Sequence, residues 1–211
     1  MHRPSVNDGL TITPFRDRPM LKRTLLAAAL AVVTTTAFAD PVNYDLDPAH
    51  TNVVASWNHL GFSNPILHFG DAEGTLVYDA EDVGASSVTV TLPVAGLQGF
   101  TDAFNQHLLS AELFDAAQYP EITFTSTAVE AAGEGKLEIT GDLTIKGITR
   151  TVVLDATLNG AGPHPMAGRE AIGFDASMTV KRSEFGLGYA VPAVSDEITL
   201  RITTEGLVPE V

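Results

Sequence analysis

The sequence predicts an all-β protein with one short helical insert. Apolar residues recur at every second position in most segments after Asp40, which is the period of a strand with one buried face. Val, Ile and Thr dominate these segments, and such residues favour extended structure. Clusters of Gly, Asn, Asp and Pro separate them, as chain reversals require.

Eight segments carry this pattern. In "TNVVASWNHL" the residues Val53, Ala55 and Trp57 share one face, and in "SSVTVTLPV" valines alternate with threonines. Lys146-Gly147 marks the turn of a predicted hairpin within "LTIKGITRTVVL". The segment 159–169 contains three glycines and two prolines and is predicted to be a surface loop. The eight predicted strands are 51–60, 73–79, 86–94, 121–130, 136–145, 149–158, 172–180 and 197–207.

A helix is predicted between the third and fourth strands, over 105–118 ("NQHLLSAELFDAAQ"). Thr101 or Asp102 is the expected N-cap, since their side-chain oxygens accept hydrogen bonds from free backbone N–H groups. Phe104 and Leu108 are four residues apart and share one helix face. Antiparallel strands with one apolar face form either a sandwich or a barrel. The single insert suits a barrel with a covered end.

The N-terminal region has the features of a secretory signal peptide. From Met20, the basic pair Lys22-Arg23 precedes an apolar run, and Ala37-Phe38-Ala39 provides a small-residue cleavage site. We therefore expect cleavage after Ala39 and export to the periplasm. Residues 1–19 precede a complete signal, so translation starting at Met20 is an open alternative to Met1. We assign 1–19 as a possible mis-assigned upstream segment, 20–39 as the signal peptide and 40–211 as one domain.

The part expected after cleavage is strongly acidic. It keeps 24 of the 26 Asp and Glu residues but only 7 of the 12 Lys and Arg residues, which gives a formal net charge of −17. This charge argues against nucleic acid and anionic membrane surfaces as partners. No second apolar run of spanning length follows the leader, so we expect no integral membrane span in the mature protein.

The sequence offers no catalytic or metal-binding constellation, and we expect neither enzymatic activity nor a cofactor. It contains no cysteine, no G-x-S-x-G elbow and no phosphate-binding glycine loop. His50, His59 and His68 recur every nine residues, an odd spacing that turns neighbours on one strand to opposite faces. For His50 and His59 we expect a buried hydrogen-bonding role that fixes the first strand, rather than metal ligation.

Several motifs in this order resemble the YceI-like family of exported lipid-binding proteins. They are "YDLDPAHT", "WNHLGFS", "HLLSAELFDAAQYPEITFTSTAVE", "GDLTIKGITRTVVLDATL", "KRSEFGLG" and "VSDEITLRI", and together they span roughly 44–205. The chain departs from the family pattern at Thr51, where a serine is usual, and at "ILHFGD", where a Gly-x-Phe is common. Trp57 is bulkier than the usual aliphatic residue and is expected to shorten or reshape a cavity.

The resemblance implies an extended, eight-stranded antiparallel lipocalin-like β-barrel with a helical segment. It also implies an elongated apolar cavity for a polyisoprenoid or another long-chain amphiphile, without an established enzymatic activity. Arg182 could meet a polar head group or pair with Asp196 or Glu197, and we favour the pairing. The expected apolar wall consists of Trp57, Phe69, Phe104, Leu108, Phe114, Phe124, Phe174 and Phe185.

Two further possibilities stay open at this stage. One is a non-enzymatic stress-response or protein-interaction barrel whose core is filled by side chains. An inward-facing aromatic residue is more often packing than ligand contact, so the aromatic residues alone do not separate the two functions. The other possibility is a homodimer, because an exposed edge strand or an open barrel mouth favours association.

Overall fold

The computed structural model describes residues 40–210, so the predicted leader and upstream segment lie outside the described residues. One sheet contains all the strands, and all its pairings are antiparallel. The elements are β1 (Val42–Leu46), β2 (Asn52–Ser56), β3 (Ile66–Phe69), β4 (Glu73–Tyr78), β5 (Ser87–Pro93), β6 (Leu97–Gln98), α1 (Asp102–Leu109), β7 (Glu121–Gly133), β8 (Lys136–Ile145), β9 (Ile148–Pro163), β10 (Glu170–Lys181) and β11 (Glu197–Leu207), with short 3-10 turns at Val83–Ala85, Val94–Gly96 and Arg182–Phe185.

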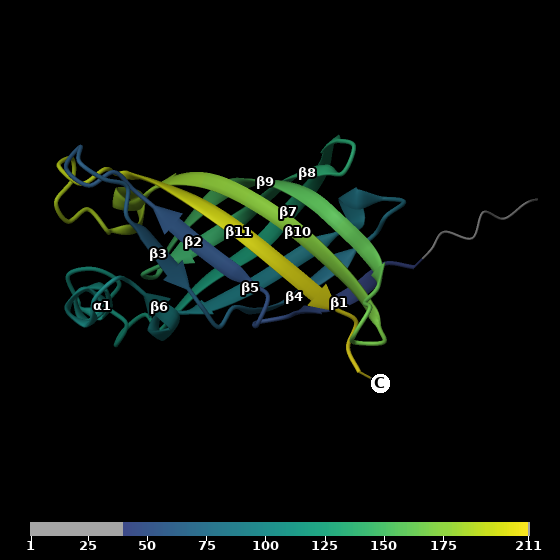
Figure 1. Cartoon of the computed structure of the whole chain (residues 1–211). Coiled ribbons are helices and arrows are strands. Elements are labelled where there is room, and N and C mark those ends of the chain that lie inside the picture. Colours follow the sequence, from purple (N-terminus) through teal and green to yellow (C-terminus); the bar gives the residue numbers. More distant parts are fainter. Residues whose placement is uncertain (1–39, 211) are drawn as a thin grey trace, which may run out of the picture. The chain divides into compact units, whose positions relative to one another are not determined.

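Eight strands close into a barrel, as the resemblance implies (Figure 1). The ring runs β1-β4-β5-β7-β8-β9-β10-β11, and β1 closes it by pairing with β11 through Asp45 opposite Leu207 and Leu46 opposite Gly206. Closure gives the barrel wall continuous pairing and removes its free edges. The sheet therefore forms a barrel rather than the sandwich that the strand pattern also allowed.

Three short strands lengthen the barrel at one end. β2 continues the path of β1 along β11, β3 pairs with β2, and β6 pairs with β3. Each of the eight barrel paths thus contains one predicted strand, and β1, β3 and β6 are the additional pieces. We call this the mouth end; it also carries α1, the loop 57–65 and the segment 182–196, while the C-terminus lies at the far end (Figure 1).

Helix α1 lies between β6 and β7 in the chain, at the mouth end (Figure 1). The side chain of Thr101 accepts a hydrogen bond from the backbone N–H of Phe104 and caps the helix. The helix ends at Leu109, so the predicted bounds of 105–118 are wrong: the chain from Ser110 onward forms turns. Leu108 is buried toward the barrel, and the Val94 N–H donates to the Pro120 carbonyl at 2.8 Å. The insert therefore lies at the mouth end of the barrel, where a covering helix was predicted (Figure 1).

Two local predictions have different outcomes. Lys146 and Gly147 form a two-residue turn with φ angles of 52° and 71°, and Ile145 pairs with Ile148 across it. The hairpin is therefore confirmed. The predicted loop 159–169 is wrong over its first half, because β9 continues to Pro163 and only 164–169 form the connection to β10. The pairing of β9 with β10 has a register shift between Gly173 and Phe174, where Asn159 of β9 has no partner in β10, as in a β-bulge.

Candidate functional site

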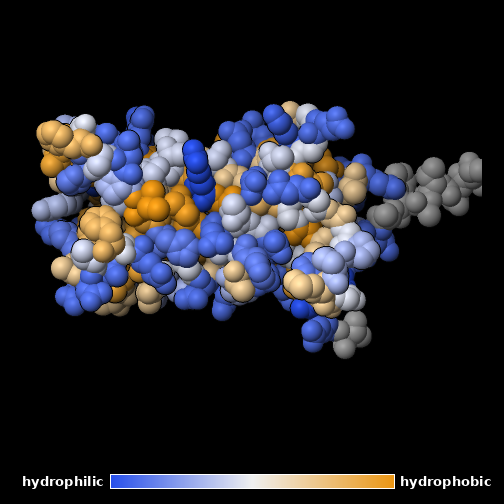
Figure 2. All heavy atoms as spheres, in the orientation of Figure 1, coloured by the Kyte–Doolittle hydropathy of each residue, from blue (hydrophilic) through white to orange (hydrophobic). Residues whose placement is uncertain are grey.

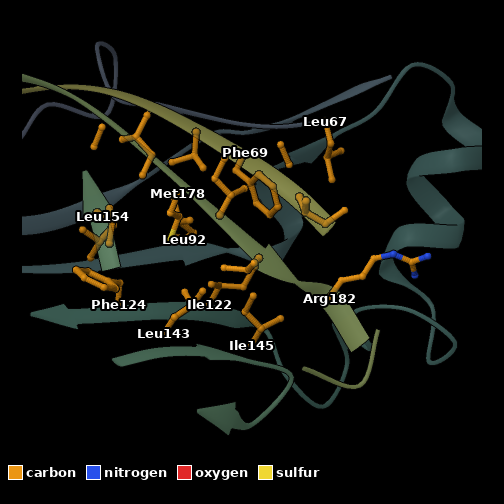
Figure 3. Close-up of a pocket in the computed structure, with 18 of the residues that line it drawn as sticks. Leu67, Phe69, Leu92, Ile122, Phe124, Leu143, Ile145, Leu154, Met178 and Arg182 are labelled. Atoms are coloured by element: carbon orange, nitrogen blue, oxygen red, sulfur yellow. The ribbon is translucent and has the colours of Figure 1, made fainter. Parts of the chain in front are cut away.

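An apolar cavity of about 900 Å³ lies inside the barrel. This volume is near the top of the range of roughly 300–1,000 Å³ that small-molecule sites occupy. Figure 3 shows side chains from several strands pointing toward one another around the space, including Phe69, Leu92, Phe124 and Leu154. The lining reaches from Leu46 of β1 to the loops of the mouth end, so the cavity follows the barrel's long direction.

The inward-facing residues show that side chains do not fill this space. The predicted apolar faces of β5, β10 and β11 point inward, yet many of their side chains remain partly accessible. Examples are Val90, Met178 and Leu200, all of which line the cavity. In a close-packed interior such residues would be fully buried. The cavity therefore contradicts a barrel whose core is filled by side chains.

All nine residues expected at the site line the cavity. Six are buried, with Phe185 at 1% exposure, and the other three, Trp57, Phe104 and Arg182, are half-buried near the mouth. The structure thus brings together residues from seven different segments of the chain. Contact with a ligand stays a prediction for each of them. The nine are Trp57, Phe69, Phe104, Leu108, Phe114, Phe124, Phe174, Arg182 and Phe185.

The aromatic residues form two contacts at the mouth end. Trp57 lies 6.2 Å from Phe104 between ring centroids, and Phe69 meets Phe114 edge to face at 6.2 Å. Both distances lie within the range of favourable aromatic pairs. These contacts join the start of the loop after β2, and strand β3, to the helical insert, so the insert contributes directly to the cavity wall.

The position of the Phe124 ring requires a glycine, Gly141, on the neighbouring strand β8. Gly141 interrupts the inward row of β8, and a Cβ atom there would lie 2.4 Å from Cζ of Phe124 and 2.7 Å from the Thr125 carbonyl oxygen. Any larger residue at position 141 would collide with the ring and with the neighbouring backbone. The glycine therefore gives the Phe124 ring room against β8.

Arg182 is held by main-chain carbonyls rather than by a carboxylate. Its Nε donates to Ser195 at 2.9 Å, one terminal nitrogen donates to Leu187 and Tyr189, and the other donates to Val194 at 3.0 Å. Among residues 40–210 no carboxylate lies within 4 Å of the guanidinium. The favoured pairing with Asp196 or Glu197 is therefore wrong, and burial lowers the pKa of Arg182.

Asp196 has a different partner next to this cluster. Its carboxylate accepts hydrogen bonds from the Ser183 backbone N–H at 2.8 Å and from the Ser183 hydroxyl at 2.7 Å. These two bonds lower the pKa of Asp196, with the charge of Arg182 as a smaller cause. The carboxylate and the guanidinium thus both tie the start of the segment 182–196 to its end, at the mouth.

The predicted buried role of His50 and His59 is wrong, because both residues are exposed. The His50 imidazole instead lies 2.7 Å from the Asp47 carboxylate, and this hydrogen bond raises the pKa of His50 and lowers that of Asp47. His68 bonds Asn52 across the β2–β3 pair at 2.8 Å. Within the described chain no three His, Asp or Glu side chains gather as a metal-ligand set.

His107 is a polar residue at the site that the sequence analysis did not select. It lines the cavity next to Tyr189, with ring centroids 5.4 Å apart. Its buried Nε2 has no aligned hydrogen-bond partner within the described chain, although Glu112 Oε2 lies 3.4 Å away. The sequence signal that could have identified His107 was its place next to Leu108, on the helix that was expected to cover the barrel.

A protein-family model described as the YceI-like domain matches residues 44–206. The chain belongs to the YceI-like family. A relative named UPF0312 protein from Pseudomonas putida strain W619 is 36% identical over 191 residues, which cover 89% of this chain and 98% of the relative. The protein named YceI from Escherichia coli O6:H1 is 35% identical with the same coverage of both chains.

Solved structures of YceI-like proteins share the barrel. The Campylobacter jejuni YCEI protein superposes with a TM-score of 0.66 at 31% identity and covers 72% of this chain and 90% of its own. A polyisoprenoid binding domain from Saccharophagus degradans superposes with a TM-score of 0.60 at 12% identity, over 80% of this chain and 99% of that domain. At that identity the second likeness supports the fold. Across 40–210 of this YceI-like chain, no helix has the length and hydropathy needed to cross a membrane.

Proposed function

We propose that this YceI-like protein binds a long-chain isoprenoid or a similar amphiphile inside its barrel, as a carrier or sequestering protein. The observation that carries the proposal is the open, apolar cavity of about 900 Å³. Burial of an apolar chain contributes about 0.8 kcal/mol per CH₂ group, so a long chain is retained without a covalent bond or a charged partner. The polyisoprenoid-binding description of one structural relative supports the same class of ligand.

The ligand's polar end is expected at the mouth. His107 offers there a ring nitrogen, Nε2, that makes no hydrogen bond within the described chain, although the exposed Glu112 carboxylate lies 3.4 Å from it, and Tyr189 lies beside the ring. The Arg182 guanidinium also lines the cavity, but four main-chain carbonyls already occupy most of its N–H groups. We therefore assign the head-group contact to His107 before Arg182. The apolar chain would extend toward Phe124 and Phe174.

We also propose that the protein acts in the periplasm after cleavage following Ala39. Strand β1 begins at Val42, so this cut would leave every strand of the barrel intact. That matters because β1 closes the ring by pairing with both β4 and β11. The proposal includes no catalytic step.

Native mass spectrometry of gently purified protein tests the binding function. We expect protein from a bacterial periplasm to carry a long-chain amphiphile, or to take up solanesol, a long-chain polyprenol, from a dilute ethanol stock. Protein that carries no lipid and takes up neither solanesol nor an acyl chain would contradict the proposal. Released ligands would be identified by tandem mass spectrometry of the solvent extract.

A further inference from the structure

Large apolar side chains are exposed at the mouth end. Leu60 is 50% exposed, Phe62 91%, Ile66 60%, Phe100 63% and Tyr189 52%. Figure 2 shows apolar side chains gathered at the end of the molecule where Figure 1 places the loop between β2 and β3. Five of the eight large apolar residues exposed in the described chain are at or beside this end. Such a concentration marks an interaction surface.

Three segments carry four of these residues, Ile66 follows the first segment as the start of β3, and contacts link the segments into one structure. The Leu60 N–H donates to the Ala193 carbonyl at 3.2 Å, and the Ser195 N–H donates to the Asn58 carbonyl at 3.0 Å. Through these bonds the segment 57–65 lies against the segment 187–195. We call the segments 57–65, 94–101 and 187–195 the mouth rim.

The third segment joins through aromatic stacking. The Phe100 ring stacks on Phe104 with centroids 4.5 Å apart and planes 14° apart, and Phe104 in turn lies beside Trp57. The same rim borders the cavity, since Pro65, Phe100 and Tyr189 all line it. The exposed apolar surface is therefore continuous with the apolar interior.

The loop 57–65 holds Phe62 outward in a defined conformation. The His59 N–H donates to the Ser63 carbonyl at 2.8 Å, and the Gly61 N–H donates to the Asn58 side chain at 2.8 Å. Leu60 adopts a φ of 56°, which is unfavourable for a residue with a side chain. Strained backbone of this kind persists where the surrounding structure fixes it and is common at functional sites. The exposed Phe62 thus stands on an ordered turn.

The rim contains no charged residue in any of its three segments, although 18% of the whole chain is charged. The part from Asp40 onward carries a formal net charge of −17. An uncharged, aromatic-rich surface suits the interfacial region of a bilayer, where amphipathic rings lie at the headgroup level. The remaining acidic surface would be repelled by anionic lipids.

We propose that the mouth rim docks on a lipid surface of zwitterionic or uncharged lipids, with Phe62 and Phe100 inserted, and so places the cavity mouth against the bilayer. A second copy of the chain on the same rim would instead cover the mouth and bring two strongly acidic molecules together. The proposal extends the binding function, because it gives the route by which a water-insoluble chain enters the cavity.

Phe62→Asp and the matched control Met166→Asp test this docking. Met166 is 89% exposed in the connection 164–169 at the far end, so both variants add one charge at an exposed apolar residue. We expect wild type and Met166→Asp to co-sediment with phosphatidylcholine vesicles, and Phe62→Asp to bind at least about tenfold more weakly. Vesicles rich in phosphatidylglycerol should bind wild type less than phosphatidylcholine vesicles do.

Absence of wild-type binding to phosphatidylcholine, or equal binding by the two variants, would overturn the docking proposal. A wild-type dimer that Phe62→Asp dissociates in analytical ultracentrifugation, without a change in vesicle binding, would overturn it in favour of self-association. Solanesol loading from ethanol separates this proposal from the binding function. Phe62→Asp should load solanesol as wild type does, whereas failure of every variant to load would reject the cavity function and leave the vesicle result standing.

Discussion

Arg182→Met should lower the free energy of unfolding by roughly 3 kcal/mol. The guanidinium donates to four carbonyls, those of Leu187, Tyr189, Val194 and Ser195, and thereby holds the backbone of the segment above the mouth. Hydrogen bonds to charged groups contribute about 1.5–3 kcal/mol each when buried, and partial exposure of this side chain reduces the sum. Urea unfolding followed by circular dichroism measures the change.

Two comparison variants locate the cause of that loss. Arg182→Lys keeps the charge but lacks the planar fork of donors, so it should recover only part of the stability. Arg169→Met is the matched control: Arg169 donates to the Val208 carbonyl and lies 3.8 Å from an exposed Glu210 carboxylate, and its loss should cost less than about 1 kcal/mol. An Arg182→Met protein within 1 kcal/mol of wild type would contradict the carbonyl-holding role.

Ala176→Trp should abolish ligand loading while the barrel stays folded. Ala176 lines the cavity from β10, between Ala156 of β9 and Ile202 of β11. An indole at this position would occupy space that the ligand needs, and the open cavity can accept it without displacing the wall. In a filled core the same substitution would cost about 1–3 kcal/mol by overpacking.

Ser177→Trp is the control for that experiment. Ser177 follows Ala176 on β10, but its side chain is exposed on the outer face, because successive strand residues point to opposite faces. Native mass spectrometry with solanesol should show loading of Ser177→Trp and of wild type but not of Ala176→Trp. Thermal unfolding should place all three close together. A destabilised Ala176→Trp protein, or one that loads normally, would contradict an open cavity as the binding space.

Most of the barrel could be predicted because each long strand buries one face. The alternation in β8 and β10 is visible in the sequence, and it continues in the structure with the predicted residues inward. The short strands β3 and β6, of four and two residues, are too short to show a period. Their extended form depends on pairing with β2 and β3. The predicted helix, 105–118, begins and ends later in the chain than α1. The apolar residues after Leu109 have the spacing of a helix, but the chain there forms turns instead.

The apolar wall of the site could be predicted from the residue types, but its mouth could not. The contact between Asn58 and Ser195 joins residues 137 positions apart, and no local pattern predicts such a pairing. The partners of Arg182 were missed for the same reason. Carboxylates are visible in a sequence, whereas four converging carbonyls arise only from the path of the folded backbone. Phe62 and Phe100 form one exposed surface only because the fold brings together the mouth-rim segments that carry them.

The chain-length dependence of binding tests the central claim most directly. Trp57 is the only tryptophan of the chain and lines the cavity, so its fluorescence reports on binding. Titration with geraniol, farnesol and geranylgeraniol should give dissociation constants that fall more than about tenfold per added isoprene unit until the cavity is full, because each buried CH₂ contributes about 0.8 kcal/mol. Dissociation constants that do not change with chain length, or no response of Trp57 to any of the three, would contradict a barrel that binds an apolar chain in its interior.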